Sequence, residues 1–147
     1  MALDLPPAIT PITPITAACV SYAAKAFGFN EDIQYAVLIV EGGSAGKTSP
    51  PNKNNTFDIG PAQINSIHLP LLKKAGISQE MLTNNGCLNI YVQAHFIATA
   101  IRTAGPIKTE EDYLFAIARY HSKNRSVAKK YVKKLQAAFH LIYQGSS

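Results

Sequence analysis

One glutamate, Glu41, stands where a carboxyl group could do acid–base chemistry. It ends the apolar run 33–40 and is followed by two glycines. At 3.6 residues per turn, Val37 and Leu38 precede it by one turn, so its side chain should lie at the edge of a buried helix face. A carboxyl group there must be paired or keep its proton, and a general acid needs that proton near neutral pH. The alternative is a solvated glutamate at a helix C-terminus, where its charge opposes the helix dipole.

Two later segments follow Glu41 in an informative order. Segment 58–66 reads Asp-Ile-Gly-Pro-Ala-Gln-Ile-Asn-Ser, and segment 118–122 reads Ala-Arg-Tyr-His-Ser. In this order the chain resembles the lysozyme-like lytic transglycosylases, which cut the glycan strands of bacterial peptidoglycan. Three elements carry the resemblance: a helix ending in Glu plus a small residue, a Gly-x-x-Gln-Ile-Asn turn and an Ala-x-Tyr-x-Ser segment. The chain is particularly similar to the small members that accompany type IV pilus, conjugation and secretion machines. The resemblance covers nearly the whole chain from Cys19 to about Tyr131.

The resemblance implies a mechanism in which Glu41 is the catalytic residue. It would protonate the glycosidic oxygen between N-acetylmuramic acid and N-acetylglucosamine. It would then remove the proton of the muramyl C6 hydroxyl as that oxygen closes a 1,6-anhydro ring, while the N-acetyl group stabilises the positive charge in between. The resemblance also implies a periplasmic or exported location, no cofactor, and partners in a pilus, conjugation or secretion apparatus.

The turn after Asp58 supplies candidate substrate-binding residues. Gly60 has no Cβ, so backbone and a bulky sugar could approach each other closely there. Gln63 and Asn65 each offer a donor and an acceptor, which suits N-acetyl and hydroxyl groups. The alternative is a turn in which the asparagine stabilises its own backbone.

The later segment adds Tyr120 and Ser122 as substrate-binding candidates. Tyr120 could hydrogen-bond Glu41 or the sugar, as the corresponding family tyrosine is thought to do, or it could bury its ring and leave its hydroxyl in water. Where the family pattern has Asn after this tyrosine, the chain has His121, which leaves the role of that position open.

A second carboxylate decides between two reaction types. Glycosidases with two carboxylates pair the acid with a base or nucleophile. The candidate in the motifs is Asp58, which resembles part of the turn more than a partner of Glu41, so we group it with the substrate-binding residues. A reducing-end product would instead indicate a lysozyme-type muramidase that uses Asp58.

The two cysteines, Cys19 and Cys87, lie 68 positions apart without the CxxC spacing of redox or zinc sites. They could be small buried residues. In an exported protein they could instead form a disulfide, which would contribute roughly 4 kcal/mol to the stability of the fold. Their positions resemble those of the disulfide-bearing subgroup of the family. Because His68, His95 and His140 do not converge with other ligands at metal-binding spacing, we predict no metal.

Composition indicates one globular domain of 147 residues, 47% apolar and 16% charged. No apolar run approaches the roughly 18 residues that span a bilayer, and the first residues do not resemble a signal peptide, as would also hold for a mature exported domain.

The net charge of +5 would suit contact with a polyanion. Alternatively, the late cations form the solvated face of the last helix. Aromatic residues do not interleave the late cations as in a single-strand binding platform, so we predict no nucleic acid partner. These cations are Lys123, Arg125, Lys129, Lys130, Lys133 and Lys134.

The patterns predict a mainly α, lysozyme-like domain over 17–147 behind an extended proline-rich arm, 1–16. Residues 42–55 should form a long loop, and a small hairpin could lie between 46 and 63. Caps and apolar spacing predict seven helices. They are expected at 17–27, from the residue after Asn30 to 41, and at 66–74, 78–83, 89–103, 109–118 and 125–143.

Two readings compete with an enzyme. The chain could be a basic helical binding module in which Glu41 is incidental, and DNA retention that weakens steeply with salt would support that reading. It could also be a wall-binding relative that has lost activity, a reading that His121 and the long loop keep open.

Overall fold

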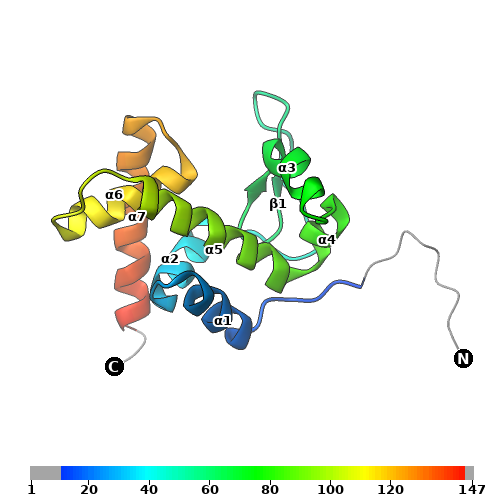
Figure 1. Ribbon diagram of the computed structural model, residues 1–147, viewed down its shortest axis with the longest axis horizontal. Coiled ribbons are helices and arrows are strands. Elements are labelled where there is room, and N and C mark those ends of the chain that lie inside the picture. The colour runs from blue at the N-terminus through cyan, green and yellow to red at the C-terminus, as the bar shows by residue number, and fades with distance from the viewer. Residues whose placement is uncertain (1–10, 145–147) are drawn as a thin grey trace, which may run out of the picture.

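The computed structural model describes residues 11–144 (Figure 1). Within this range the chain is mainly α, as predicted, with a small antiparallel hairpin. Residues 1–10 of the predicted arm lie outside the described residues. The elements are α1 (Ala17–Phe27), α2 (Glu31–Glu41), β1 (Asp58–Ile59), β2 (Ile64–Asn65), the 3-10 helix η1 (Ser66–His68), α3 (Leu69–Lys74), α4 (Gln79–Asn84), α5 (Gly86–Thr103), α6 (Glu110–His121) and α7 (Arg125–Gln144).

Local capping residues explain most helix ends. Gly28 and Gly42 follow α1 and α2 in the left-handed region, with φ of 77° and 66°, which glycine adopts at little cost. Asn30 caps α2 by accepting a hydrogen bond from the backbone of Asp32. Thr109 forms a capping box at the start of α6. These ends agree with the predicted ones because each depends on residues within one turn.

α5 begins at Gly86, earlier than the predicted start at 89. The side chain of Asn85 accepts a hydrogen bond from the backbone N–H of Leu88 and therefore caps the helix one turn sooner. The end of the arm crosses this point: the N–H of Gly86 donates to the carbonyl of Thr13 at 2.8 Å. A Cβ at residue 86 would lie 2.9 Å from that carbonyl oxygen, so the crossing requires glycine.

The hydrophobic core has two parts, and α5 contributes to both. The larger part joins α2, α6 and α7 around Ile97 of α5, and includes the fully buried Val37, Ile117 and Leu135. The smaller part lies between the hairpin, α3, α4 and Val92 of α5. Figure 1 shows α5 as the long helix that runs from the side of α3, α4 and β1 to the side of α6 and α7. α5 therefore holds the hairpin side against the helical side.

The hairpin pairs β1 with β2, with Asp58 opposite Asn65. β1 lies within the predicted range 46–63 and β2 just beyond it, and Thr48 also forms an isolated antiparallel bridge with Ile59. The backbone N–H of Ser49 donates to the carbonyl of Asp58 at 2.8 Å, and that of Gly60 donates to the carbonyl of Lys47 at 3.0 Å. Residues 47–49 therefore lie alongside β1.

One buried amide, Asn89 of α5, ties the hairpin to the helical framework. Its side chain is fully buried, and its Nδ2 donates to the carbonyls of Ile59 at 2.9 Å and Leu82 at 3.0 Å. Its Oδ1 accepts from the N–H of Ala62 at 2.9 Å. Gly60, at φ 69°, packs against it so closely that a Cβ would lie 2.3 Å from Nδ2. The turn therefore depends on a residue that the sequence analysis did not single out.

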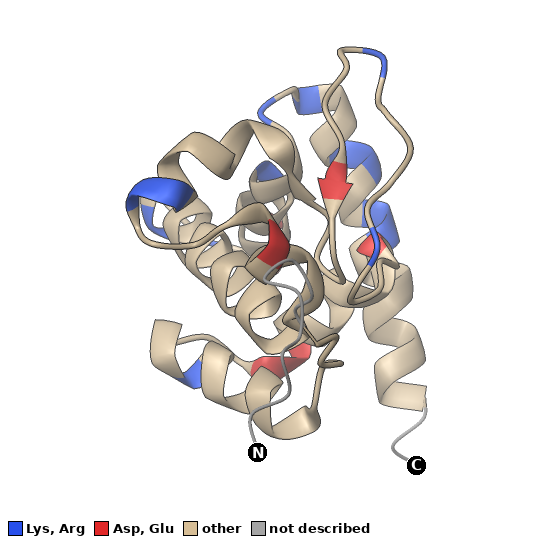
Figure 2. Ribbon diagram, turned by 90° about the vertical axis from the view of Figure 1, so that its right-hand side faces the viewer, with Lys and Arg blue, Asp and Glu red and all other residues tan. Residues whose placement is uncertain are grey.

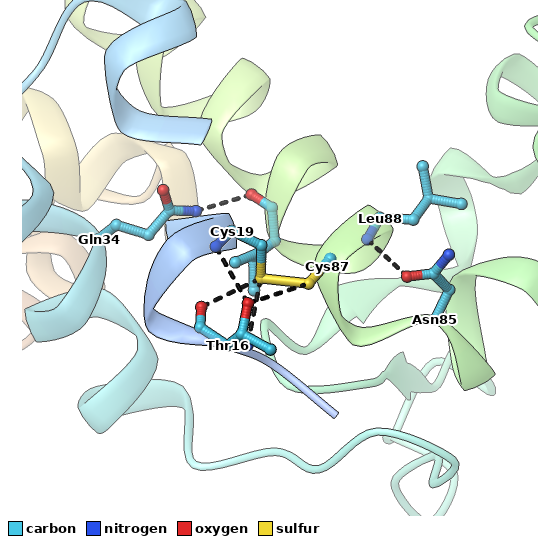
Figure 3. Close-up of a disulfide and its surroundings, with 7 residues drawn as sticks. Thr16, Cys19, Gln34, Asn85, Cys87 and Leu88 are labelled. Carbon is cyan, nitrogen blue, oxygen red and sulfur yellow. Dashed lines mark hydrogen bonds between the residues drawn. A yellow bond between two sulfur atoms is a disulfide. The ribbon is translucent and has the colours of Figure 1, made fainter. Parts of the chain in front are cut away.

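A disulfide between Cys19 and Cys87 joins the first turns of α1 and α5, with the two Cα atoms 5.6 Å apart. Figure 3 shows it beside Thr16, which caps α1 by accepting from the backbone of Cys19 at 3.1 Å. The same view includes Gln34 of α2, whose Nε2 donates to the carbonyl of Ile90 in α5 at 2.7 Å. The disulfide implied by the resemblance is thus present, and α1, α2 and α5 are joined at this end of the molecule.

Candidate active site

A cleft of about 400 Å³ opens where the end of α2, the loop before β1, the hairpin and the end of α6 meet. It gathers five of the seven residues that the sequence analysis proposed for catalysis or substrate binding. Gly60 and Ser122 are not among the described residues that line it. The lining residues are Glu41, Asn52, Asn54, Asp58, Gln63, Ile64, Asn65, Ile67, His68, Phe96, Tyr120 and His121.

Glu41 lies largely inside the protein, with 11% of its side chain exposed. Its Oε1 accepts a hydrogen bond from the hydroxyl of Tyr131 at 2.8 Å. Nδ1 of His121 lies 3.3 Å from the same oxygen, and the His121 ring stacks on the Tyr131 ring with centroids 4.5 Å apart. The carboxyl group is therefore held from one side by two rings, and it still reaches the cleft.

Tyr131 is a site residue that the sequence analysis did not identify. It lies on α7 with 2% exposure, and burial, together with the charge of Glu41, raises its pKa far above the ordinary tyrosine value. The hydroxyl therefore keeps its proton and remains a donor. A signal was present in the sequence: Tyr131 falls on the buried stripe of α7 with Ala128, Leu135 and Ala138, so its hydroxyl needs an internal partner.

Tyr120 does not bond to Glu41. Its hydroxyl donates to the carbonyl of Ala62 at 3.2 Å, which ties the end of α6 to the turn between β1 and β2. Burial, followed by the charges of Glu41 and Asp58, raises its pKa well above the ordinary value. The hydroxyl that bonds to Glu41 is therefore that of Tyr131, whereas contact of Tyr120 with a sugar stays a prediction.

Asp58 faces the cleft, and two amides hold its carboxylate. Oδ1 accepts from Nδ2 of Asn65 at 3.1 Å, and Oδ2 accepts from Nδ2 of Asn52 at 3.3 Å. The second donor hydrogen of Asn65 goes to Thr56, and its Oδ1 caps η1 by accepting from Ile67. Asn65 is thus occupied by the turn, the alternative noted from sequence, and it acts on the cleft through Asp58.

Gln63 lies in the turn between β1 and β2, and its backbone adopts the left-handed conformation with φ of 53°. Its Nε2 donates to the carbonyl of Gly60 at 3.0 Å, and its Oε1 receives no hydrogen bond from the described residues. The backbone of Gly43 packs directly on this turn: a Cβ at 43 would lie 2.0 Å from the carbonyl oxygen of Gly60. The second glycine after Glu41, Gly43, therefore brings the end of α2 against Gln63. Gly60 itself gives room to Asn89 rather than to a ligand, which corrects the reason first assigned to it.

Two aromatic side chains, His68 and Phe96, line another part of the cleft, with ring centroids 4.6 Å apart. Burial lowers the pKa of His68, so the ring is neutral near pH 7. Ser122 lies just past α6, where its Oγ accepts from the backbone of Asn124 at 3.1 Å. The cleft thus combines carboxylates, amides and apolar rings, a lining that suits a ligand with hydroxyl and amide groups on apolar ring faces.

Across residues 11–144, no group of three or more His, Cys, Asp or Glu side chains is arranged to hold a metal ion. In the same range, none of the helices has the length and apolar character needed to cross a membrane.

Comparison with known proteins finds relatives in bacteria. No protein-family model matches the chain. It is 28% identical over 122 residues to the invasion protein IagB of Salmonella typhimurium, covering 80% of this chain and 72% of that protein. It is 35% identical over 91 residues to a peptidoglycan-binding-like protein of Escherichia coli O157:H7, covering 57% of this chain and 54% of the relative. The chain is therefore similar, at modest identity, to an invasion protein over most of its length and to a peptidoglycan-binding-like protein over about half of it.

Proposed function

We propose that this protein is a peptidoglycan lytic transglycosylase with Glu41 as its single catalytic acid and base. The observation that carries the proposal is the buried carboxyl of Glu41, held by Tyr131 and open to a cleft lined by amides and rings. The peptidoglycan-binding-like relatives and the ordered motifs support peptidoglycan as the substrate.

In the proposed reaction, Glu41 gives its proton to the glycosidic oxygen between N-acetylmuramic acid and N-acetylglucosamine, and that bond breaks. The N-acetyl group of the muramyl sugar stabilises the positive charge that develops at C1. The Glu41 carboxylate then takes the proton of the C6 hydroxyl, whose oxygen bonds to C1 and closes the 1,6-anhydro ring. The carboxyl group ends protonated, as it began, so the cycle needs no second protein carboxylate.

Tyr131 and His121 position the acid in this scheme. Both contact Oε1, which leaves Oε2 as the oxygen that carries the transferred proton. A carboxyl held on one side keeps a constant direction toward the cleft, and correct orientation is a large part of catalytic power.

We propose an exported or periplasmic location, where peptidoglycan lies. The disulfide between Cys19 and Cys87 supports this, because such bonds persist in oxidising compartments. From the resemblance to the small specialised members of the family, we also propose that the protein opens the wall locally for an envelope-spanning pilus, conjugation or secretion machine.

The test is digestion of purified sacculi with products identified by mass. The wild type should release muropeptides with 1,6-anhydromuramyl ends, and Glu41→Gln should release none while its circular dichroism and thermal unfolding stay close to those of the wild type. Glu110→Gln is the matched control, because it makes the same chemical change at an exposed position of α6. A wild-type protein that binds sacculi and releases no product would refute the enzymatic proposal in favour of a binding role.

A second candidate is a lysozyme-type muramidase, favoured by the presence of Asp58 in the same cleft. In that reaction Asp58 would act as base or nucleophile, water would be consumed, and the product would carry a reducing end. Asp58→Asn separates the two: full loss of activity with reducing-end products in the wild type supports the hydrolase. Anhydro products that persist in Asp58→Asn support the transglycosylase.

A further inference from the structure

A second cavity, of about 630 Å³, lies between the loop that follows α5 and the helices α6 and α7. It is larger than the candidate active-site cleft and shares no lining residue with it. Its volume is in the range of sites that bind a small ligand or a few residues of a peptide. The proposed reaction makes no use of it.

Part of the lining of this cavity is apolar. Phe115 and Ala116 line it from α6, Val132 from α7, and Ile107 from the connecting loop. Ala116 and Val132 are buried, with 1% and 8% exposure, whereas Ile107 is 39% exposed. A ligand that enters can therefore bury an apolar group against these side chains.

Four cations also line the cavity: Arg119, Arg125, Lys129 and Lys133. All four are exposed, and none forms an ion pair with a described carboxylate. Of the two acidic residues in the lining, Asp112 is occupied, because its carboxylate accepts from the backbone N–H groups of Lys108 and Thr109. With Glu111 as the second carboxylate, the lining holds four cations and two anions, an excess of positive charge beside apolar side chains.

The charges on α7 are not spread evenly. Figure 2 shows that the Lys and Arg segments of the helix that ends at the C-terminus lie in its N-terminal half. Lys129 and Lys133 line the cavity, whereas Lys130 and Lys134, with the same spacing on the same helix, do not. One of the two lysine pairs thus lines the cavity and the other does not, so charge reversal of the second pair can serve as a matched control for charge reversal of the first.

We propose that this cavity is a docking site for an acidic segment of a partner protein, with carboxylates on the cations and one apolar side chain inside. Arginine pairs carboxylates through a planar fork, and two of the four cations are arginines. A duplex nucleic acid or a membrane surface would contact an extended face, whereas this site is concave and partly apolar. Charge complementarity and the apolar side chains in the lining thus both favour a peptide.

Fluorescence anisotropy with a labelled peptide, Glu-Asp-Leu-Phe-Asp-Glu, tests the site. The peptide should bind the wild type about tenfold or more tightly than Glu-Asp-Ser-Ser-Asp-Glu, because only the first can bury apolar side chains. Lys129→Glu with Lys133→Glu should weaken binding by about thirtyfold, whereas Lys130→Glu with Lys134→Glu should change it by about threefold or less. The two double variants have equal net charge, so a general electrostatic effect would weaken binding equally in both.

Equal weakening by the two double variants would therefore overturn the proposal. It would also be overturned if the two peptides bound alike, or if a twelve-nucleotide thymidine strand or anionic vesicles bound the cavity more tightly and with the same variant pattern. Circular dichroism of each variant checks the fold. Because the readout is peptide binding, failure here is distinct from failure of the sacculus digestion.

Discussion

The hydrogen bond from Tyr131 to Glu41 makes a specific prediction about stability. Tyr131→Phe removes only the hydroxyl and keeps the buried ring that stacks on His121. The acceptor is a carboxyl that is 11% exposed, and the hydrogen bond is 2.8 Å long. Removing the donor leaves a largely buried acceptor without its partner, which costs about 1–3 kcal/mol. We therefore expect the free energy of unfolding at pH 7 to fall by that amount.

The contribution is measured with a double-mutant cycle. Wild type, Tyr131→Phe, Glu41→Ala and the double variant are unfolded in urea with the disulfide intact and followed by circular dichroism. Tyr131→Phe should lower the free energy of unfolding by about 1–3 kcal/mol when Glu41 is present, or Tm by roughly 2–12 °C. Beside Ala at position 41 it should cost about 0.5 kcal/mol or less, since the acceptor is gone.

Two results would contradict this reasoning. If Tyr131→Phe costs the same in both backgrounds, the hydroxyl acts through something other than Glu41. If it costs nothing in either, the hydrogen bond does not contribute to the fold. Tyr120→Phe is a matched control, because its hydroxyl donates to the backbone of Ala62, so its cost should not depend on position 41.

Three further predictions concern the framework around the cleft. Asn89→Leu leaves one backbone N–H and two carbonyls without their partner and should cost about 3 kcal/mol or more in urea unfolding, whereas a cost under about 1 kcal/mol would contradict this role. Reducing the disulfide of Cys19 and Cys87 should lower stability by about 4 kcal/mol, measured with and without reductant, and the Cys19→Ser, Cys87→Ser protein should match the reduced wild type. Burial and the charge of Glu41 raise the pKa values of Tyr120 and Tyr131 in the folded protein, so the unfolded chain alone loses these protons above about pH 10. Stability should therefore be unaffected by these groups below pH 10 and then fall by about 1.4 kcal/mol per pH unit for each tyrosine, with a shallower slope in Tyr131→Phe.

Features that depend on neighbours within one helical turn could be predicted from the sequence. The end of α1 at Gly28, the cap of α2 at Asn30 and the capping box of Thr109 all agree with expectation. The apolar run before Glu41 predicted a carboxyl at the edge of a buried face, and its side chain is 11% exposed. These agree because helix periodicity and capping are local interactions.

Features that depend on how helices cross could not be predicted in this way. The donor to Glu41 is Tyr131, which is 90 positions away in the chain, rather than the motif residue Tyr120. Gly60 accommodates Asn89, and Asn65 serves the turn, although the motif alone suggested contact with a sugar.

The sequence by itself thus determined the helices, the carboxyl at the edge of a buried face and the polar turn. Only the tertiary structure decided which hydroxyl holds the carboxyl and which amides remain open to the cleft. The physical reason is that a polar side chain bonds to whichever partner the packing of α5, α6 and α7 brings within about 3 Å, and that packing joins residues far apart in the chain.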